Sequence, residues 1–375
     1  MSATTDTPLD TPDIAFLTET VRTPLSAAER AQRMSAPGFG RVLTEHMVTA
    51  SWTSGRQWHD LGLSPYRPLP MDPAMAALHY GQTIFEGLKA YRQHDGSVGI
   101  FRPDAHAHRF ARSAHRLMMP ELPTPLFLRA LEELIRADRA WVPDRPNHSL
   151  YLRPLLYARE AVLALRPARE YQFLLIAFVA EGFFNNDLSP VSVWVSTEYS
   201  RAARGGTGDV KIPGNYAGAF AAQAEATAHG CHQVVWLDSA ERRWVEEMGG
   251  MNLFFVHGRG SQARVTTPPL TGTLLPGVTR DALLTLLADE GIPVAETPLT
   301  VDDWRELAAR GEITEVFACG SAAGVTPVGT VRSADAEWTI SGGRPGPITR
   351  RAAHLLTSAQ RGTLPDPHGW VHQVS

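Results

Sequence analysis

Hydrophobic residues in the first half of the chain recur with two different periods. Apolar or alternating runs predict strands over 43–52, 151–158 and 171–180. Apolar residues three and four positions apart predict helices over 104–117 and 125–140, and a further helix is expected to lead into Phe85. The first half is therefore predicted to be one mixed α and β unit.

The second half alternates strand and helix patterns. Strands are predicted over 191–196, 233–237, 252–256 and 315–318, and helices over 216–229, 279–290, 301–309 and 349–359. Between the halves, residues 181–190 are rich in Gly, Asn, Asp and Pro, a composition typical of turns. This stretch is the predicted linker.

The length of the chain also favours two domains. Its 375 residues exceed what one hydrophobic core usually organises. We expect a loose leader over 1–35, a small α/β domain over 36–180, a linker over 181–190 and a larger α/β domain over 191–375. The predicted fold class is α+β, with a cleft between the domains.

Charge and cysteine content restrict the classes of partner. The chain has 35 Lys and Arg against 39 Asp and Glu, so no overall positive field would hold nucleic acid or an anionic membrane. Its apolar runs are shorter than the roughly 20 residues of a membrane-spanning helix, and its beginning lacks the plan of a signal peptide.

The two cysteines have no CxxC spacing, so neither a disulfide framework nor a metal site is expected. We expect a cytoplasmic protein whose partners are small molecules.

Lys211 is the first candidate for chemistry. Glycines at 205, 206 and 208 precede it, and Pro213 and Gly214 follow it. A lysine on a rigid, partly desolvated backbone can attack an aldehyde, which Schiff-base formation requires. A solvated loop lysine is the alternative interpretation. A phosphate-binding P-loop does not fit the sequence, because no Gly directly precedes Lys211 and no Ser or Thr follows it.

Two further patterns accompany this lysine. Glu246 and Glu247 lie in a compact turn over 245–252, and a pyridinium ring needs one buried carboxylate to keep its nitrogen protonated. A surface hairpin with two solvated glutamates is the alternative. The segment 272–280 opens an amphipathic helix whose first amides, with Thr279 as cap, could hold a phosphate ester. The small residues of 319–324 would let a ligand approach the backbone, although close helix packing explains them equally well.

In their order along the chain, these segments resemble the branched-chain amino-acid aminotransferases. These belong to the fold-type-IV pyridoxal-phosphate enzymes, which also include D-amino-acid aminotransferase and aminodeoxychorismate lyase. The resemblance extends from about Gly40 to Arg350. The matching segments are YGQTIFEGLKAY (80–91), FRP (101–103), 108–114, SLYLRP (149–154), the Lys211 segment, EMGGMN (247–252), 267–270, LPGVTR (275–280) and 315–328.

The resemblance implies a role for each matching residue. Lys211 would form the Schiff base with pyridoxal 5'-phosphate and shuttle protons, Glu247 would pair with the pyridine nitrogen, and Tyr216 would bond the ring hydroxyl. The remaining implied cofactor residues are Arg109, Gly250, Met251, Asn252, Val278, Thr279 and Ser321. The implied substrate residues are Phe85, Tyr80, Tyr151, Arg153, Gly250, Ser321 and Ala322.

The resemblance also implies the reaction and the assembly. The expected reaction is transamination of Leu, Ile and Val with 2-oxoglutarate, giving branched-chain 2-oxo acids and L-glutamate, with the cofactor in the cleft between the domains. Arg153 and Tyr151 suit a pocket that takes aliphatic and acidic side chains in turn. A homodimer is implied, in which Tyr80 and the loop near Leu165 serve the partner subunit.

Three departures from the family pattern leave alternatives open. Pro213 replaces a usual Gly, Ser321 replaces a usual Thr, and Ala323 and Thr326 stand where some members carry a redox CxxC. A D-amino-acid transaminase or an aminodeoxychorismate-lyase-type enzyme would share the fold. A transaminase of a specialised pathway with an unusual amino donor is a second alternative. A non-catalytic binding protein is a third, against which the combination of Lys211, Glu247 and Arg109 argues.

Overall fold

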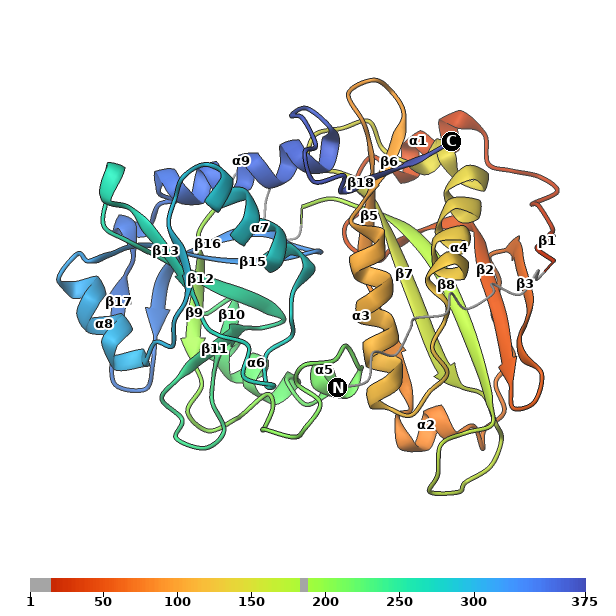
Figure 1. Ribbon diagram of the computed structural model, residues 1–375, viewed down its shortest axis with the longest axis horizontal. Coiled ribbons are helices and arrows are strands. Elements are labelled where there is room, and N and C mark those ends of the chain that lie inside the picture. The colour runs from red at the N-terminus through yellow and green to blue at the C-terminus, as the bar shows by residue number, and fades with distance from the viewer. Residues whose placement is uncertain (1–14, 183–187) are drawn as a thin grey trace, which may run out of the picture.

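The computed structural model describes residues 15–182 and 188–375. Residues 1–14 of the predicted leader and 183–187 of the predicted linker lie outside this part of the chain. Two sheets with their helices form two lobes that lie side by side, and α5 (Gly214–Ala217) lies between them (Figure 1). The mixed α and β composition agrees with the predicted fold class.

The first sheet is almost entirely antiparallel. Its order is β1-β3-β2-β8-β7-β5-β6-β18, with β4 paired to β7, and only β1 and β3 run parallel. Its strands are β1 (Leu17–Thr18), β2 (Val42–Thr53), β3 (Gln57–Pro65), β4 (Thr83–Phe85), β5 (Leu88–Arg92), β6 (Val98–Phe101), β7 (Ser149–Ala158), β8 (Glu170–Ala180) and β18 (Val371–Val374).

Two helices cover one face of this sheet, α3 (Pro103–Arg116) and α4 (Thr124–Ala137) (Figure 1). Each begins with proline in its first turn, where the missing N–H group has no helical partner to lose. The apolar side of α4 contributes Leu126, Leu131 and Leu134, all buried in the core under the sheet. Phe110 and Ala114 of α3 are buried in the same core, which holds the helix that carries the predicted Arg109 against the lobe.

The second sheet closes on itself. Its order is β11-β10-β9-β16-β15-β12-β13-β14, β17 pairs with β16, and an additional β11–β12 pairing completes a ring. Its strands are β9 (Val191–Val195), β10 (Gln233–Leu237), β11 (Val245–Met248), β12 (Met251–His257), β13 (Arg264–Thr267), β14 (Val294–Glu296), β15 (Ile313–Gly320), β16 (Gly324–Arg332) and β17 (Glu337–Thr339). The other helices are α1 (Ala27–Arg33), α2 (Ala76–Tyr80), α6 (Phe220–Ala228), α7 (Val278–Asp289), α8 (Val301–Ala309) and α9 (Pro347–Arg361).

Each strand predicted in the first half is confirmed, as β2, β7 and β8, and the second-half strands are confirmed as β9, β10, β12 and β15. The helix predicted to lead into Phe85 ends instead at Tyr80, because Gly81 takes up a left-handed conformation, and Phe85 belongs to β4. The helix predicted over 216–229 is interrupted at Gly218, a residue of low helix propensity, and forms α5 and α6.

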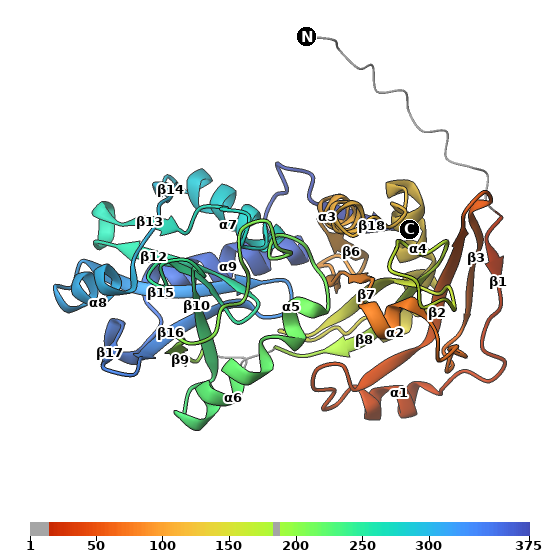
Figure 2. The same ribbon diagram turned by 90° about the horizontal axis from the view of Figure 1, so that it is seen from below.

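The ends of the chain differ from the expectation as well. Residues of the predicted leader form β1 and α1, and Ser26 and Glu29 cap the start of α1 reciprocally. Seen from below, the chain after α9 returns from the second lobe, and β18 adds to the edge of the first sheet at β6 (Figure 2). The first lobe therefore includes residues from beyond the predicted division of the chain.

No helix in the described ranges 15–182 and 188–375 is long and apolar enough to cross a membrane.

The core of the first lobe offers a test of the packing. Leu131 on α4 has none of its surface exposed, so Leu131→Ala should lower the free energy of unfolding by about 2–5 kcal/mol. The matched control is Leu128→Ala on the same helix, where the side chain is only partly buried and the loss should be smaller. Chemical denaturation of both variants measures the difference, and equal losses would contradict this packing.

Candidate active site

Lys211 lies in the segment between β9 and α5, and its backbone is attached to the first lobe on both sides. Its N–H donates to Ser113 Oγ of α3 at 3.0 Å, and its carbonyl accepts from the Phe85 N–H at 3.1 Å. The half-buried side chain crosses toward α5, where Nζ donates to Tyr216 Oη at 2.7 Å. The structure therefore confines one amine between the two lobes.

The local sequence explains this placement. Asn215 Nδ2 donates to the carbonyls of Thr207 and Val210 at 2.7 and 2.9 Å, which closes the glycine-rich turn before the lysine. Pro213 has φ -57°, a value that suits its ring, and its carbonyl accepts the Tyr216 N–H at 2.9 Å. The departure at Pro213 therefore fits the first turn of α5 without distortion.

Aromatic and cationic side chains surround this amine. The Phe85 and Tyr216 rings meet edge to face at 5.1 Å, and Lys211 Nζ lies 4.8 Å from the Phe85 ring centre. Arg153 Cζ lies 5.2 Å from the Phe85 ring and 5.3 Å from the Tyr151 ring. Five of the predicted residues thus form one contiguous group.

Glu247 is buried at the end of β11, with 2% of its surface exposed. Its carboxylate accepts from the Leu275 N–H at 2.7 Å and from Asn252 Nδ2 at 3.2 Å. Its neighbour Glu246 bonds Thr273 and has 5% of its surface exposed. The alternative of a surface hairpin with two solvated glutamates is therefore wrong.

Arg201 neutralises Glu247, and sequence reasoning missed it. Its Nε lies 3.0 Å from Glu247 Oε2, and both side chains are buried. Burial raises the pKa of Glu247, and Arg201 opposes that rise by stabilising the charged form. A buried carboxylate calls for a cationic partner, but no local motif distinguishes Arg201 from the many other arginines of the chain.

The tip of the β11–β12 hairpin contacts two other parts of the site. A Cβ on Gly250 would lie 3.5 Å from the Tyr216 ring, so the hairpin touches α5. Met251 packs against Gly320 at the end of β15. Gly250 and Met251 therefore lie beside other predicted site residues, and Asn252 contacts Glu247 itself.

Arg109 is oriented by Glu86, a second residue whose part was not predicted. Arg109 Nε and Nη2 donate to the two Glu86 oxygens at 2.6 and 2.8 Å, and His106 Nδ1 lies 2.8 Å from the same carboxylate. Burial alone would raise the pKa of Glu86, but Arg109 and then His106 bring it well below its ordinary value. A buried carboxylate thus holds the guanidinium in one orientation.

The predicted phosphate residues converge at the start of α7. Arg109 Nη1 reaches the Pro276 carbonyl at 3.4 Å, and Thr279 Oγ1 lies 3.5 Å from Ser321 Oγ. The N-cap of α7 is Gly277, which has no side chain to bond the first amides, so the prediction of Thr279 as the cap is wrong. An uncapped helix start beside a guanidinium and two hydroxyls has the donor groups that an anion site requires.

The turn that contains Ser321 and Ala322 connects β15 to β16 and faces the first lobe. Ala322 packs against the buried group formed by Tyr151 and Phe178, whose rings stack at 4.8 Å. A Cβ on Gly87 would collide with Tyr151 Oη, so a glycine is required there. The residues predicted to bind the substrate thus come from both lobes.

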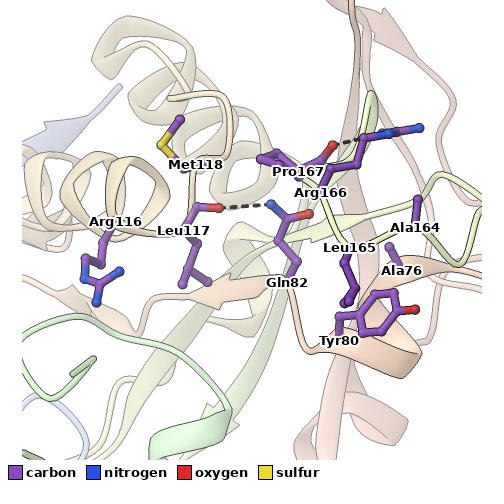
Figure 3. Close-up of a pocket in the computed structure, with 10 residues that line it drawn as sticks. All are labelled: Ala76, Tyr80, Gln82, Arg116, Leu117, Met118, Ala164, Leu165, Arg166 and Pro167. Carbon is purple, nitrogen blue, oxygen red and sulfur yellow. Dashed lines mark hydrogen bonds between the residues drawn. The ribbon is translucent and has the colours of Figure 1, made fainter. Parts of the chain in front are cut away.

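Tyr80 is the exception among the predicted residues. It lies at the end of α2 with 46% of its surface exposed. It lines a surface pocket together with Gln82, Met118 and Leu165, all of which Figure 3 labels. The single chain does not bring Tyr80 into the group around Lys211.

Comparison with known proteins identifies the class to which this fold and site belong. The family described as amino-transferase class IV matches residues 83–331, and the chain belongs to this family. A curated relative, the branched-chain-amino-acid aminotransferase of Mycobacterium tuberculosis, is 52% identical over 352 residues, covering 94% of this chain and 96% of the relative.

Solved structures show the same fold. The branched-chain amino acid aminotransferase of Escherichia coli matches with a TM-score of 0.71 and 28% identity, over 87% of this chain and 99% of that one. The T.th. branched-chain amino acid aminotransferase with pyridoxamine 5'-phosphate matches with a TM-score of 0.70 and 27% identity, over 87% and 98%. The family resemblance and the α+β fold predicted from the sequence are confirmed.

The Glu86–Arg109 pair predicts a pH-dependent loss of stability. Glu86→Gln removes the charge beside a buried guanidinium and should lower the free energy of unfolding by about 3–5 kcal/mol near neutral pH. Because the folded pKa of Glu86 is depressed, its contribution is complete above the ordinary value of 4.5 and is lost as pH falls below it. Denaturation of both proteins at several pH values measures this. A stability difference that does not shrink below pH 4.5 would contradict the ion pair.

Proposed function

We propose that this protein is a pyridoxal-phosphate-dependent transaminase of branched-chain L-amino acids. In the proposed reaction, the amino group of leucine, isoleucine or valine passes to 2-oxoglutarate, giving the branched-chain 2-oxo acid and L-glutamate. The single observation that carries the proposal is the Lys211 amine, held 2.7 Å from Tyr216 Oη between the two lobes. Family membership and the names of the relatives agree with it.

The residues around Lys211 fit pyridoxal phosphate. The uncapped start of α7, Arg109 and the Ser321 hydroxyl would hold the phosphate, and the buried Glu247 carboxylate would pair with the ring nitrogen. Tyr216 would bond the ring hydroxyl. When bound, the cofactor supplies a protonated ring that takes up negative charge from the substrate Cα.

Each residue of the site then has a task that its contacts support. Lys211 Nζ removes the proton from the substrate Cα and later returns one, and Tyr216 Oη keeps that amine in place between these events. Arg201 lies 3.0 Å from Glu247 and opposes the rise in the pKa of Glu247 that burial causes, so it favours the charged carboxylate that a pyridinium requires. Glu86 holds Arg109 toward the start of α7, where the phosphate would bind.

The substrate pocket requires an apolar wall and one polar group that acts only with the acidic substrate. Phe85 and Tyr151 supply the wall, and the Ser321–Ala322 turn supplies backbone groups for the α-carboxylate. In the described ranges, Arg153 Nε is buried without a hydrogen-bond partner. We assign this unpaired donor to the second carboxylate of 2-oxoglutarate and glutamate.

A homodimer belongs to the same proposal. Large apolar side chains that line the surface pocket of Figure 3 are exposed, including Leu165 at 89% and Met118 at 71%. A surface of this kind is typical of a subunit contact. A second copy packed there would bring Tyr80 and the loop around Leu165 to the partner's pocket.

We also propose a domain division and a cellular location. We keep a small domain over 36–180 and a larger one over 191–375 joined by 181–190, although β1 (Leu17–Thr18) and β18 (Val371–Val374) also pair into the sheet of the smaller domain. We place the protein in the cytoplasm and take amino acids and 2-oxo acids as its partners.

A spectrum of the loaded protein tests the proposed reaction. L-leucine should change the absorbance of the bound cofactor, and 2-oxoglutarate should restore it. Lys211→Ala should lower turnover by at least about 100-fold, because the proton-transfer group is lost. A response to D-alanine but not to L-leucine would favour the D-specific alternative and contradict the proposal.

The assignment of Arg153 predicts a difference between the two substrates. Arg153→Met should raise the KM for 2-oxoglutarate by about 10- to 100-fold, the usual effect of losing a hydrogen bond to a charged group. The KM for leucine should change much less, because leucine has no second carboxylate. Steady-state kinetics with each substrate varied in turn measures the ratio, and equal changes for both substrates would refute the assignment.

A further inference from the structure

Lys89 lies across the lobe boundary from the turn that is proposed to bind the substrate α-carboxylate. It is on β5, and in the sheet register it pairs with Tyr151 on β7, which in turn pairs with Phe178 on β8. Directly paired residues project from the same face of a sheet. Lys89 therefore belongs to the row of side chains that faces the turn.

Its amine makes one direct bond to that turn. Lys89 Nζ donates to the Ala322 carbonyl at 2.8 Å, joining the first lobe to the second. The carbonyl and the N–H of one trans peptide point in opposite directions. Fixing the Ala322 carbonyl toward Lys89 therefore turns the N–H of Ala323 away from it and sets the orientation of the turn.

Within the described ranges, Lys89 forms no ion pair with an acidic side chain. Burial, and to a smaller extent Arg361 on α9, lowers its pKa to about 8, so the amine is still largely protonated at neutral pH. A partly buried cation without a counterion is costly, and a bound anion would offset that cost.

The surrounding groups do not supply the missing negative charge. Lys89 shares a small cavity with Tyr91, His106 of α3, Thr279 of α7 and Ser321. Burial raises the pKa of Tyr91 and lowers the pKa of His106, which keeps both side chains neutral near pH 7. Tyr151 also faces Lys89 from β7, and Arg361 adds positive charge only.

The composition of the chain sets this lysine apart. Of the 35 lysines and arginines, only Lys89 and Lys211 are lysines. A lysine provides a compact point charge on a flexible stem, whereas a guanidinium is broad and planar. In a chain that uses arginine almost everywhere, the two lysine side chains thus bond Tyr216 and Ala322, both residues of the proposed site.

We infer that Lys89 is a positioning residue for the substrate carboxylate: it fixes the Ser321–Ala322 turn through the Ala322 carbonyl and provides the positive charge that a bound carboxylate neutralises. This inference rests on the proposed function. It adds a residue that acts on the substrate without touching the reacting atoms.

Reciprocal coupling gives a test that does not depend on turnover. If the charge of Lys89 strengthens carboxylate binding by some factor, binding must lower the acid dissociation constant of Lys89 by the same factor and so raise its pKa. In wild-type protein loaded with cofactor and labelled with 13C at lysine Cε, the Lys89 signal is assigned by its loss in Lys89→Met. Its titration is recorded with and without 4-methylvalerate, a branched carboxylate that lacks an amino group.

The midpoint of the Lys89 titration should rise by about one pH unit when 4-methylvalerate binds, which corresponds to tenfold coupling. An unchanged midpoint with ligand bound would overturn the inference. A midpoint that rises when the cofactor is added but not when the carboxylate is added would also overturn it, because Lys89 would then serve the phosphate instead.

Kinetics provides the second measurement. Lys89→Met should raise the KM for both leucine and 2-oxoglutarate on the order of tenfold and change kcat less, and Lys89→Arg should restore part of the affinity. The matched control is Arg92→Gln on the same strand, which removes a cation that bonds Arg139 and Val142 carbonyls away from the turn. If Arg92→Gln raises KM equally, general weakening of the lobe explains the result and the inference fails.

The two proposals fail in different ways. A wild-type protein that does not exchange amino groups between leucine and 2-oxoglutarate contradicts the proposed function. A wild-type protein that does so, with Lys89 variants of unchanged KM, contradicts only the role of Lys89.

Discussion

Contacts from the first lobe fix the backbone of Lys211, whose Nζ donates to Tyr216 Oη. The lysine belongs by sequence to the second half of the chain, yet its backbone bonds to α3 and β4 of the first lobe. A flexible lysine loses rotamer freedom when it is ordered, so this anchoring is needed to keep the amine in one place. The rest of the site is arranged around that fixed amine.

Two buried ion pairs provide the electrostatic part of that arrangement. Glu86 orients Arg109 at one end of the site, and Arg201 neutralises Glu247 at the other. Buried ion pairs contribute little net stability compared with apolar packing, so their value here lies in holding charge at defined positions. The same reasoning applies to Lys89, whose charge is left without an acidic partner among the described residues beside the proposed carboxylate site.

Local pattern and motif were sufficient to predict much of the fold and the proposed site. The long strands β2, β7 and β8 have strong apolar runs, and Lys211, Glu247 and Arg109 lie within recognisable segments. Short strands such as β5, β6 and β11 contain too few residues to establish a period. Their positions depend on pairing partners that lie far away in the sequence.

The supporting residues of the site escaped prediction for a related reason. Arg201, Glu86 and Lys89 act through partners in other elements. Glu86 and Lys89 lie in the matching segment 80–91, but that segment does not indicate which residues they contact. Gly87 illustrates the same limit, because only the approach of Tyr151 from β7 explains why no side chain fits there. The roles of such residues depend on tertiary packing, which the pattern of a single sequence does not reveal.

The chain's two lysines make one measurement especially direct. The protein loaded with pyridoxal phosphate is reduced with borohydride, digested, and its peptides are analysed by mass spectrometry. We expect a phosphopyridoxyl group on the peptide that contains Lys211 and none on the peptide that contains Lys89. A label on Lys89, or a bound cofactor that leaves both lysines unmodified after reduction, would contradict it.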